Sequence, residues 1–295
     1  MAGLGTRLLS ATKEQPKEML PVFARGRRGD LCLKPIVQLV FEELYSEGLR
    51  EFCFVVGRTK RAIEDHFTPD PSYVEMLDAR GKYGPAAELE VFYKMVEEST
   101  LVWMNQPEPL GFGDAVLRAK AFVGEESFLV HAGDSHFLSR NASHLRKIIG
   151  AREKLLADAL FLVQEVEDPR PFGVVVGDEV HDFCLRVKRL VEKPKVPISN
   201  LAIKPVYLFR PEIFEALGAT RPGHGGELQL TDGIQKMIDW GMSVYGVIVD
   251  RGDVELDVGT PESYWHAQNM SHNNFVRGPE LETTAHLEYE SRDPA

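Results

Sequence analysis

Apolar residues recur along the chain in two alternating patterns. After Pro35, the apolar residues of positions 36–44 recur at helical spacing, which predicts a helix that begins at the proline. A continuous apolar run then covers 52–56, and such a run is typical of a strand that is buried on both faces of a parallel sheet. We therefore expect helices and buried strands to alternate.

The same alternation continues to about residue 270. Strand-like runs cover 100–104, 127–131, 159–166 and 244–249, and helical patterns cover 113–122, 144–156, 229–240 and 261–270. Between 172 and 192 the pattern changes to short strands with turns, as in an inserted or mixed-sheet region. Alternating strands and helices favour an α/β sandwich with a mostly parallel sheet. We expect one domain over 1–270 and an acidic, partly mobile tail over 271–295, because periodicity fades there.

A glycine-containing turn lies at the start of the chain, where Ala2 to Arg7 read AGLGTR. Closely spaced glycines let backbone N–H groups approach phosphate oxygens, and a following helix N-terminus adds positive potential. The turn is not a dinucleotide fingerprint, because the third glycine position holds Leu8, and the chain contains no P-loop motif. Taken alone, the turn fits a tight surface turn as well as a phosphate site.

The position of this turn is unusual. In α/β folds a phosphate-binding turn normally follows an apolar strand, and a strand needs about five to six residues. Here only Met1 precedes Ala2. We therefore expect the natural chain to start upstream, with a first strand that this sequence lacks; an intact-mass measurement that places the native start at Met1 would refute this expectation.

The charge of the chain indicates which classes of ligand are compatible with it. The 295 residues carry a net charge of −11, and this acidic balance argues against general nucleic-acid binding, which needs a basic footprint. Residues 1–34 reverse the sign, with seven basic and three acidic residues. A small anionic substrate is therefore compatible with the chain, because a local cluster can oppose the global charge.

The cysteines and the apolar runs point to the cytoplasm. Cys32, Cys53 and Cys184 lie far apart without a C-x-x-C motif, which favours reduced thiols over a zinc site or disulfides. No apolar run approaches the roughly 18 residues that suggest a membrane span. Charged residues within positions 7–17 interrupt the apolar core that a secretion signal would need.

A second loop presents a lysine. Residues 13–21 read KEQPKEMLP, and the two prolines stiffen the loop around Lys17. An ammonium group held there could close over the phosphates that Arg7 contacts. The alternative is a solvated charged loop.

Together the two loops resemble the signature of the sugar-nucleotide pyrophosphorylases (nucleotidyltransferases), a glycine loop ending in Gly-Thr-Arg followed by Pro-Lys-x-x-Leu-Pro. Further segments resemble the bacterial-type UTP–glucose-1-phosphate uridylyltransferases, in order over about residues 2–270: AIEDHF (62–67), QPEPLGFGDAV (106–116), VEKP (191–194), SNLAI (199–203), GGELQLTD (225–232) and DVGT (257–260). The resemblance implies a Rossmann-like, glycosyltransferase-A-like three-layer sandwich with a mostly parallel mixed sheet. Two positions depart from the family: Asp114 stands where His is more frequent, and Ser135 where a second Asp is common.

The resemblance assigns the nucleotide contacts. The turn would line the nucleotide and its triphosphate through Ala2, Gly3, Leu4, Gly5, Thr6 and Arg7. Lys17 would hold phosphate oxygens. Gln106 would read the pyrimidine edge, because a carboxamide presents a donor and an acceptor side by side, and Gly111 would let the backbone approach the base. An exposed loop glutamine is the alternative for Gln106.

The resemblance also assigns a metal. Asp134 follows the strand predicted over 127–131, and in the family Asp134 and Asp257 occupy the positions that carry the metal. Ligands collect at the carboxyl ends of strands, and Mg²⁺ takes one or two carboxylates plus substrate phosphates. A helix cap or turn aspartate is the alternative. A transition-metal site with His131 and His136 is less favoured, because phosphates suit Mg²⁺.

A sugar subsite is implied at the end of the 172–192 region. Glu192 and Lys193 would point to opposite faces if their strand continued. By resemblance Glu192 accepts hydrogen bonds from sugar hydroxyls, Lys193 neutralises the sugar phosphate and acts with Arg7 and Lys17 as a catalytic cation, and Gly173 lies under the hexose. A plain surface pair is the alternative.

The implied reaction transfers a uridylyl group from UTP to glucose 1-phosphate, with Mg²⁺ as cofactor, and gives UDP-glucose and pyrophosphate. The sugar phosphate is already anionic, so no general base is required. Two alternatives stay open: a thymidylyltransferase or another pyrimidine-specific relative, and a catalytically silent regulatory subunit that binds sugar nucleotides. We expect no nucleic-acid or membrane partner, and the sequence permits a homodimer or homotetramer.

Overall fold

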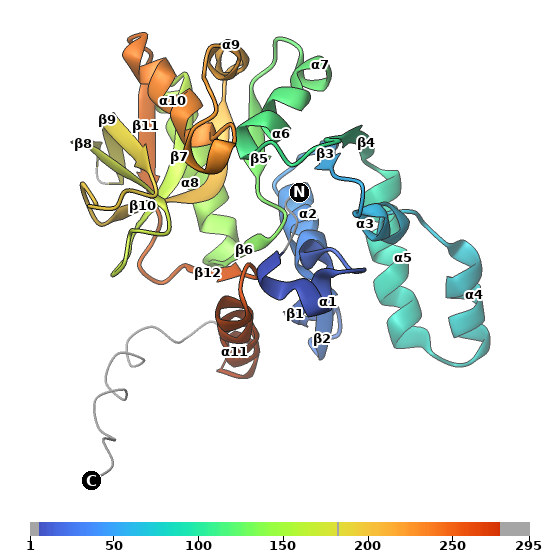
Figure 1. The fold of residues 1–295 in the computed structure, drawn as a ribbon. Coiled ribbons are helices and arrows are strands. Elements are labelled where there is room, and N and C mark those ends of the chain that lie inside the picture. Colours follow the sequence, from blue (N-terminus) through green and yellow to red (C-terminus); the bar gives the residue numbers. More distant parts are fainter. Residues whose placement is uncertain (1–5, 182, 278–295) are drawn as a thin grey trace.

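The largest sheet of the described residues is a six-stranded mixed sheet with helices on both faces, at the left of Figure 1. The computed structural model describes residues 6–181 and 183–277. In sheet order the strands are β5 (Phe128–His131), β10 (Leu201–Phe209), β7 (Ala159–Glu165), β11 (Val244–Ile248), β9 (Cys184–Glu192) and β8 (Gly173–His181). The covering helices are α8 (Ser143–Leu155) on one face and α6 (Phe112–Arg118), α9 (Glu212–Gly218) and α10 (Leu230–Asp239) on the other. This is the three-layer α/β sandwich that the sequence predicts.

Strand β7 shows why the sheet needs helices on both sides. Leu160 and Leu162 pack in the same apolar cluster as residues of α8, whereas Phe161 and Val163 pack with α9 and α10. All four side chains are fully buried. Because successive side chains of a strand point to opposite faces, a continuous apolar run is stable only between two helical layers.

The strand directions are more mixed than the apolar runs suggest. Within the six-stranded sheet β7 and β11 are parallel. The other described pairings are antiparallel: β10 with β5, β7 and β8, β9 with β11, and β8 with β9. Helical cover on both faces, rather than strand direction, produces continuous apolar runs, so those runs could not fix the direction of pairing.

A separate parallel pair, β3 (Glu51–Val56) and β4 (Thr100–Asn105), lies beside this sheet. The prediction of a helix and a strand here is confirmed by α2 (Ile36–Ser46) and β3. Between the two strands the chain forms three helices, which are α3 (Arg61–His66), α4 (Pro71–Ala79) and α5 (Tyr83–Glu97). The last two, α4 and α5, were not predicted.

Two further strand pairs complete the described fold. They are β1 (Pro21–Arg25) with β2 (Leu31–Pro35), and β6 (Ser135–Leu138) with β12 (Val254–Asp257). Helix α11 (Pro261–Arg277) packs on β1 and β12 and runs seven residues past the predicted end at 270. The helix predicted over 113–122 is divided at Ala119 into α6 and α7 (Lys120–Val123).

Short helical turns occupy the start of the described chain and two later positions. The turns are η1 (Thr6–Leu8), α1 (Leu9–Thr12) and η2 (Lys17–Met19), and later ones are η3 (Arg140–Ala142) and η4 (His224–Gly226). The predicted acidic tail lies mostly outside the described residues, which end at Arg277. Among the helices that the structure describes, none combines the length and apolar character that a bilayer crossing requires.

Candidate active site

A polar groove of about 340 Å³ gathers the predicted metal and sugar residues. It lies where β8, the end of β9 and the end of β12 meet the loop between β5 and β6. Five of the predicted site residues line it: Asp134, Gly173, Glu192, Lys193 and Asp257. The fold therefore brings together residues that are more than a hundred positions apart in the sequence.

Asp134 and Asp257 lie side by side because β12 pairs with β6. Asp257 stands opposite Ser135 in this pairing, and the N–H of Val258 donates to the carbonyl oxygen of Asp134 at 3.2 Å. Burial raises the pKa of Asp257 above its ordinary value, and the negative charge of Asp134 raises it further. Two neighbouring carboxylates in a partly buried groove favour the binding of a cation.

Lys17 places a positive charge beside Asp134, at this end of the groove. From η2, its ammonium group forms an ion pair with the carboxylate of Asp134. Burial disfavours the charged forms of Lys17 and Asp134, but the attraction between the two charges outweighs this cost. The pKa of Lys17 is therefore raised, with Glu18 and Asp257 contributing, and the pKa of Asp134 is lowered. Both groups are charged at neutral pH.

The carboxylates fit a magnesium ion that also binds phosphate. Mg²⁺ commonly takes one or two protein carboxylates and completes its shell with water and phosphate oxygens. Within residues 6–181 and 183–277, no three His, Cys, Asp or Glu side chains are grouped as a ready metal cage. His131 makes a local contact instead, from Nδ1 to the carbonyl oxygen of Ala132 at 2.7 Å. The donor set therefore suits a metal that arrives with a phosphorylated ligand.

At the other end of the groove, the backbone turns sharply after β9. The strand stops at Glu192, and Lys193 adopts a left-handed conformation with φ of 39°. Its N–H donates to the carbonyl oxygen of Phe172 at 3.0 Å, and its Nζ lies 3.3 Å from Glu192 Oε1. The expected opposite faces do not occur, because the strand does not continue. Both side chains line one groove, so the pair is not a plain surface pair.

Glu192 is held in place from two sides. The hydroxyl of Thr231, on α10, donates to Glu192 Oε2 at 2.6 Å. Gly173 pairs with Glu192 across β8 and β9, and a Cβ at Gly173 would lie 3.1 Å from the same oxygen and 3.0 Å from Ile203. Glycine at this position therefore leaves room for the carboxylate.

Gln106 is buried directly after β4. Its Nε2 donates to Asp114 Oδ2 at 2.7 Å and to the carbonyl oxygen of Gly111 at 3.1 Å. Asp114 also lies 3.3 Å from Nε of Arg118. The aspartate that replaces the family's more frequent histidine thus fixes the orientation of the Gln106 carboxamide. Gln106 is therefore not the exposed loop glutamine of the alternative interpretation, and its contact with a pyrimidine stays a prediction.

Gly111 has a structural reason to be glycine. Its φ is 109°, and a Cβ there would lie 2.6 Å from the carbonyl oxygen of Leu228. The neighbouring Gly113 N–H donates to the same oxygen at 2.9 Å. The loop before α6 is thereby packed against the 227–229 segment, which also lines the groove at Glu227 and Gln229. That Gly111 makes room for a base stays a prediction.

The N-terminal turn is only partly described. Ala2, Gly3, Leu4 and Gly5 lie outside the described residues, and the described chain opens at Thr6. Arg7 lies exposed on η1. Of the three predicted catalytic cations, Lys193 lines the groove and Lys17 pairs with the groove residue Asp134, and the contact of Arg7 with phosphate stays a prediction.

A polar network in the wall of the groove was not predicted. Ser135 donates from its hydroxyl to Glu255 Oε1 at 2.7 Å, and Lys204 Nζ lies 2.7 Å from Glu255 Oε2. The Lys204 side chain is only 5% exposed. The sequence could have indicated Glu255, because it precedes Asp257 by two positions on one strand and therefore lies on the same face. Lys204 gave no such signal.

A second missed contact holds the loop that carries Lys17. Lys60, just before α3, lies with its Nζ 2.7 Å from Glu18 Oε2, and both side chains are almost fully buried. Adjacent residues of one loop therefore bind two different regions: Lys17 binds the segment after β5, and Glu18 binds the segment after β3. No local sequence pattern links positions 42 residues apart.

Comparison with known proteins shows the family of the chain. A family model described as nucleotidyl transferase matches residues 1–274, which include every groove residue named above. The chain belongs to the nucleotidyl transferase family.

Individual relatives are similar over most of their length. The chain is 40% identical over 242 residues to a putative UTP–glucose-1-phosphate uridylyltransferase of Methanocaldococcus jannaschii, covering 81% of this chain and 80% of that protein. It is 34% identical over 281 residues to the UTP–glucose-1-phosphate uridylyltransferase of Pseudomonas aeruginosa, covering 94% and 95%. Among solved structures, it resembles a UDP-glucose pyrophosphorylase complexed with UDP-glucose, with a TM-score of 0.79, 29% identity and coverage of 92% and 96%. A UTP-bound enzyme of the same kind from Acinetobacter baumannii gives a TM-score of 0.79 at 28% identity, with coverage of 95% and 93%.

Proposed function

We propose that this protein transfers the uridylyl group of UTP to glucose 1-phosphate and releases pyrophosphate. The observation that supports this most directly is the single groove in which two carboxylates, Asp134 and Asp257, lie near Lys17 at one end, with Lys193 at the other. Such a groove provides for two phosphorylated reactants and a divalent ion. The similarity to UTP–glucose-1-phosphate uridylyltransferases supports the choice of substrates.

The proposed reaction depends on position and charge. A phosphate oxygen of glucose 1-phosphate attacks the α-phosphorus of UTP in line, the bond to the β-phosphate breaks, and pyrophosphate leaves. Two anions must approach within bonding distance, so repulsion is the main obstacle. In this proposal Lys193 neutralises the sugar phosphate, while Lys17 and Arg7 hold the triphosphate. In a groove partly shielded from water each charge has more effect than in bulk solvent.

Asp134 and Asp257 would hold a Mg²⁺ ion in this proposal. The ion, when bound, supplies Lewis-acid stabilisation of the charge on the transferring phosphorus and the leaving group. Binding of triphosphate would draw Lys17 from Asp134 to phosphate oxygens, because the carboxylate then has a metal partner. The protein's own contribution is to fix the carboxylates, through the pairing of β12 with β6.

The sugar and the base would be read by different parts of the chain. Glu192, oriented by Thr231, presents a carboxylate to sugar hydroxyls above Gly173. Gln106 turns its NH₂ group towards Asp114, so its carbonyl oxygen is the acceptor for the N–H of a uracil edge. Because thymine presents the same edge, this contact alone does not separate UTP from dTTP.

A substrate panel tests the proposal. Pyrophosphate release is measured with UTP, dTTP and CTP against glucose 1-phosphate, with Mg²⁺ present and after chelation. We expect turnover with UTP, less with dTTP, none with CTP, and loss of turnover after chelation. Preference for dTTP would favour the thymidylyltransferase alternative. Calorimetric binding of UDP-glucose without any turnover would instead favour a silent regulatory subunit.

We also propose that the protein works in the cytoplasm. Cys32, Cys53 and Cys184 are free thiols in the described structure, which supports a reducing compartment. Fractionation of the native cells followed by an activity assay tests this, and activity confined to an extracellular or membrane fraction would contradict it.

A further inference from the structure

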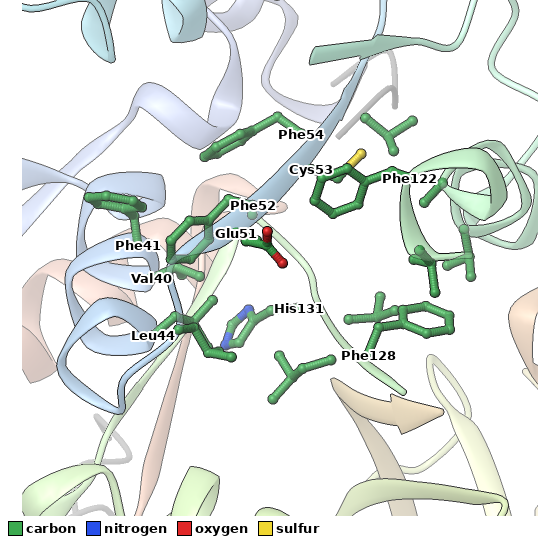
Figure 2. Close-up of a pocket in the computed structure, with 18 of the residues that line it drawn as sticks. Val40, Phe41, Leu44, Glu51, Phe52, Cys53, Phe54, Phe122, Phe128 and His131 are labelled. Carbon is green, nitrogen blue, oxygen red and sulfur yellow. The ribbon is translucent and has the colours of Figure 1, made fainter. Parts of the chain in front are cut away.

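Two cavities adjoin the loop that follows β5, and their linings differ. One, of about 830 Å³, is lined mostly by apolar side chains such as Phe52, Phe54 and Phe128 (Figure 2). The other is the active-site groove, which several carboxylates line. A hexose has a hydroxyl group on most of its carbon atoms, and a hydroxyl group taken out of water needs a hydrogen-bond partner. The polar groove therefore suits a sugar, and its carboxylates are candidate acceptors.

Glu255 is a carboxylate of the groove that the proposed function leaves without a role. It lies on β12 and lines the groove, and its side chain is 13% exposed. Asp257, two positions later on the same strand, lines the groove as well. Glu255 therefore faces the space that the proposed function gives to the substrates.

Two donors hold the Glu255 carboxylate in place. The hydroxyl of Ser135 donates to Oε1 at 2.7 Å, and Nζ of Lys204 lies 2.7 Å from Oε2. Lys204 is itself buried, with its Nζ 4.6 Å from the centre of the Phe172 ring, and its charge offsets the cost of burying a carboxylate. Each oxygen of a carboxylate can accept two hydrogen bonds. The described donors use one site on each oxygen, so one site on each remains for a ligand.

Glu192 is held in the same way as Glu255. The hydroxyl of Thr231 donates to its Oε2 at 2.6 Å, and Nζ of Lys193 lies 3.3 Å from its Oε1. Burial raises the pKa of the Tyr207 hydroxyl, and the negative charges of Glu192 and Glu255 raise it further, so both carboxylates lie near this side chain of the groove. The groove thus presents two carboxylates that are each fixed by one hydroxyl and one ammonium group.

We propose that Glu255 accepts a hydrogen bond from a hydroxyl group of the sugar, as a second acceptor beside Glu192, and so contributes to the choice of hexose. The two carboxylates lie on different strands and are fixed by separate donors, so each binds a different hydroxyl group. A sugar that lacks the hydroxyl bound by Glu255 leaves a charged acceptor without its partner, which weakens binding. The inference rests on the proposed function, because it assigns part of the same sugar subsite.

Deoxy sugars test the contact. At saturating UTP, kcat/KM is measured with glucose 1-phosphate and with its 2-, 3-, 4- and 6-deoxy analogues. The penalty of an analogue is the factor by which its kcat/KM falls below that of glucose 1-phosphate. In the wild type we expect a penalty of at least about tenfold for the analogue without the hydroxyl that Glu255 binds. Glu255→Gln keeps the shape but removes the charge, so it should lower this one penalty about fivefold and leave the other three unchanged.

A paired replacement removes the acceptor without leaving an unpaired buried charge. Glu255→Leu together with Lys204→Met should abolish the same penalty. The fold should be kept, because apolar residues of similar volume often replace a buried ion pair without loss of stability. The matched control is Lys34→Met with Glu42→Leu, which replaces an ion pair between two residues that do not line the groove and should leave all four penalties unchanged. Glu192→Gln should lower the penalty of a different analogue.

Calorimetry separates this inference from the proposed reaction. We expect Glu255→Gln to weaken the binding of UDP-glucose about fivefold and to leave the binding of UDP unchanged. A wild-type protein that binds UDP-glucose more tightly than UDP but has no turnover would contradict the proposed reaction. The comparison of the two ligands would still test the contact of Glu255 with the sugar.

Three outcomes would overturn the inference. A paired replacement that lowers kcat/KM by the same factor for all five sugars would mean that Glu255 and Lys204 only hold β12 to β10. Loss of the same penalty in Glu255→Gln and in Glu192→Gln would mean that the two carboxylates do not bind separate hydroxyl groups. Binding of UDP that weakens as much as binding of UDP-glucose would mean that Glu255 does not contact the sugar.

Discussion

The two ends of the active-site groove hold their charges in different ways. At the proposed metal end, Lys17 and Asp134 are both about one-fifth exposed, and each charge stabilises the other. At the proposed sugar end, Lys193 is 38% exposed and its left-handed backbone, rather than burial, sets its position. The comparison indicates that a removed charge is more costly at the buried end, where water cannot replace a lost partner, than at the end that solvent reaches.

Removal of Asp134 should have the largest effect. Asp134→Ala deletes a proposed metal ligand and the partner of Lys17, so we expect kcat to fall roughly 10³-fold. The matched control is Asp178→Ala, which removes an exposed aspartate of β8 and should keep the wild-type rate. Steady-state pyrophosphate release measures both variants, and circular dichroism checks that they fold. Near-normal turnover in folded Asp134→Ala protein would remove the metal end from the proposal.

The pH dependence should depend on Asp257. Because burial raises the pKa of this carboxyl above its ordinary value of 3.8, it takes up a proton at a higher pH than an exposed aspartate does. Protonated Asp257 cannot bind a cation, so activity should fall as the pH falls through this raised pKa. Excess Mg²⁺ favours the deprotonated form and should shift the acid limb to lower pH.

Two variants separate Asp257 from other groups in that profile. Asp257→Asn should lower kcat about 10²-fold and abolish the dependence of the acid limb on Mg²⁺. Asp250→Asn changes an exposed aspartate that pairs with Lys147 and should leave the profile unchanged. Rates measured from about pH 5 to about pH 8 at two Mg²⁺ concentrations, across the range where a raised carboxyl pKa acts, give the result. A Mg²⁺-dependent shift of the acid limb that is equally large in both variants would contradict the assignment.

Lys193→Ala probes the solvent-facing end. We expect the KM for glucose 1-phosphate to rise about tenfold, as for a lost charged hydrogen bond, with the KM for UTP unchanged. Lys188→Ala is the control, because Lys188 lies on β9, the strand that ends just before Lys193, and forms an exposed pair with Asp178. Initial rates over a grid of both substrates separate the two constants. A change in the KM for UTP alone would mean that Lys193 serves the nucleotide.

Thr231→Val should have the smallest effect. It keeps the side-chain shape but removes the hydroxyl that donates to Glu192 Oε2, so the KM for glucose 1-phosphate should rise about threefold to fivefold. Thr231→Ser retains the hydroxyl and should restore the wild-type value. If both variants behave alike, Thr231 contributes packing rather than the orientation of Glu192.

Local patterns predicted much of the fold. The apolar spacing of 36–44 and the run at 52–56 are confirmed by α2 and β3, and the run at 159–166 is confirmed by β7. The separation of α6 from α7 at Ala119 was not predicted, because every residue from 113 to 119 except glycine favours or tolerates a helix. The direction of strand pairing could not be predicted from the sequence either, because helices on both faces produce the same apolar run in parallel and antiparallel sheets.

In the site, too, local sequence motifs predicted some features, and tertiary packing decided others. Motif resemblance placed Asp134, Gly173, Glu192, Lys193 and Asp257, and the structure gathers these residues in one groove. It could not place Lys204 against Glu255 or Lys60 against Glu18, because each pair forms through tertiary packing of distant segments. The left-handed conformation of Lys193 was equally hidden, since a non-glycine residue gives no local sign of it.

Lys17 and Glu18 are adjacent, but their ion pairs differ in burial. Glu18 is buried with Lys60, whereas Lys17 is one-fifth exposed and pairs with Asp134 at the edge of the groove. An anion that enters the site competes only for Lys17. The loop can therefore change the partner of Lys17 while the ion pair of Glu18 with Lys60 still holds it in place. Loading and unloading of the site would then need the rearrangement of one side chain, not the release of a whole segment.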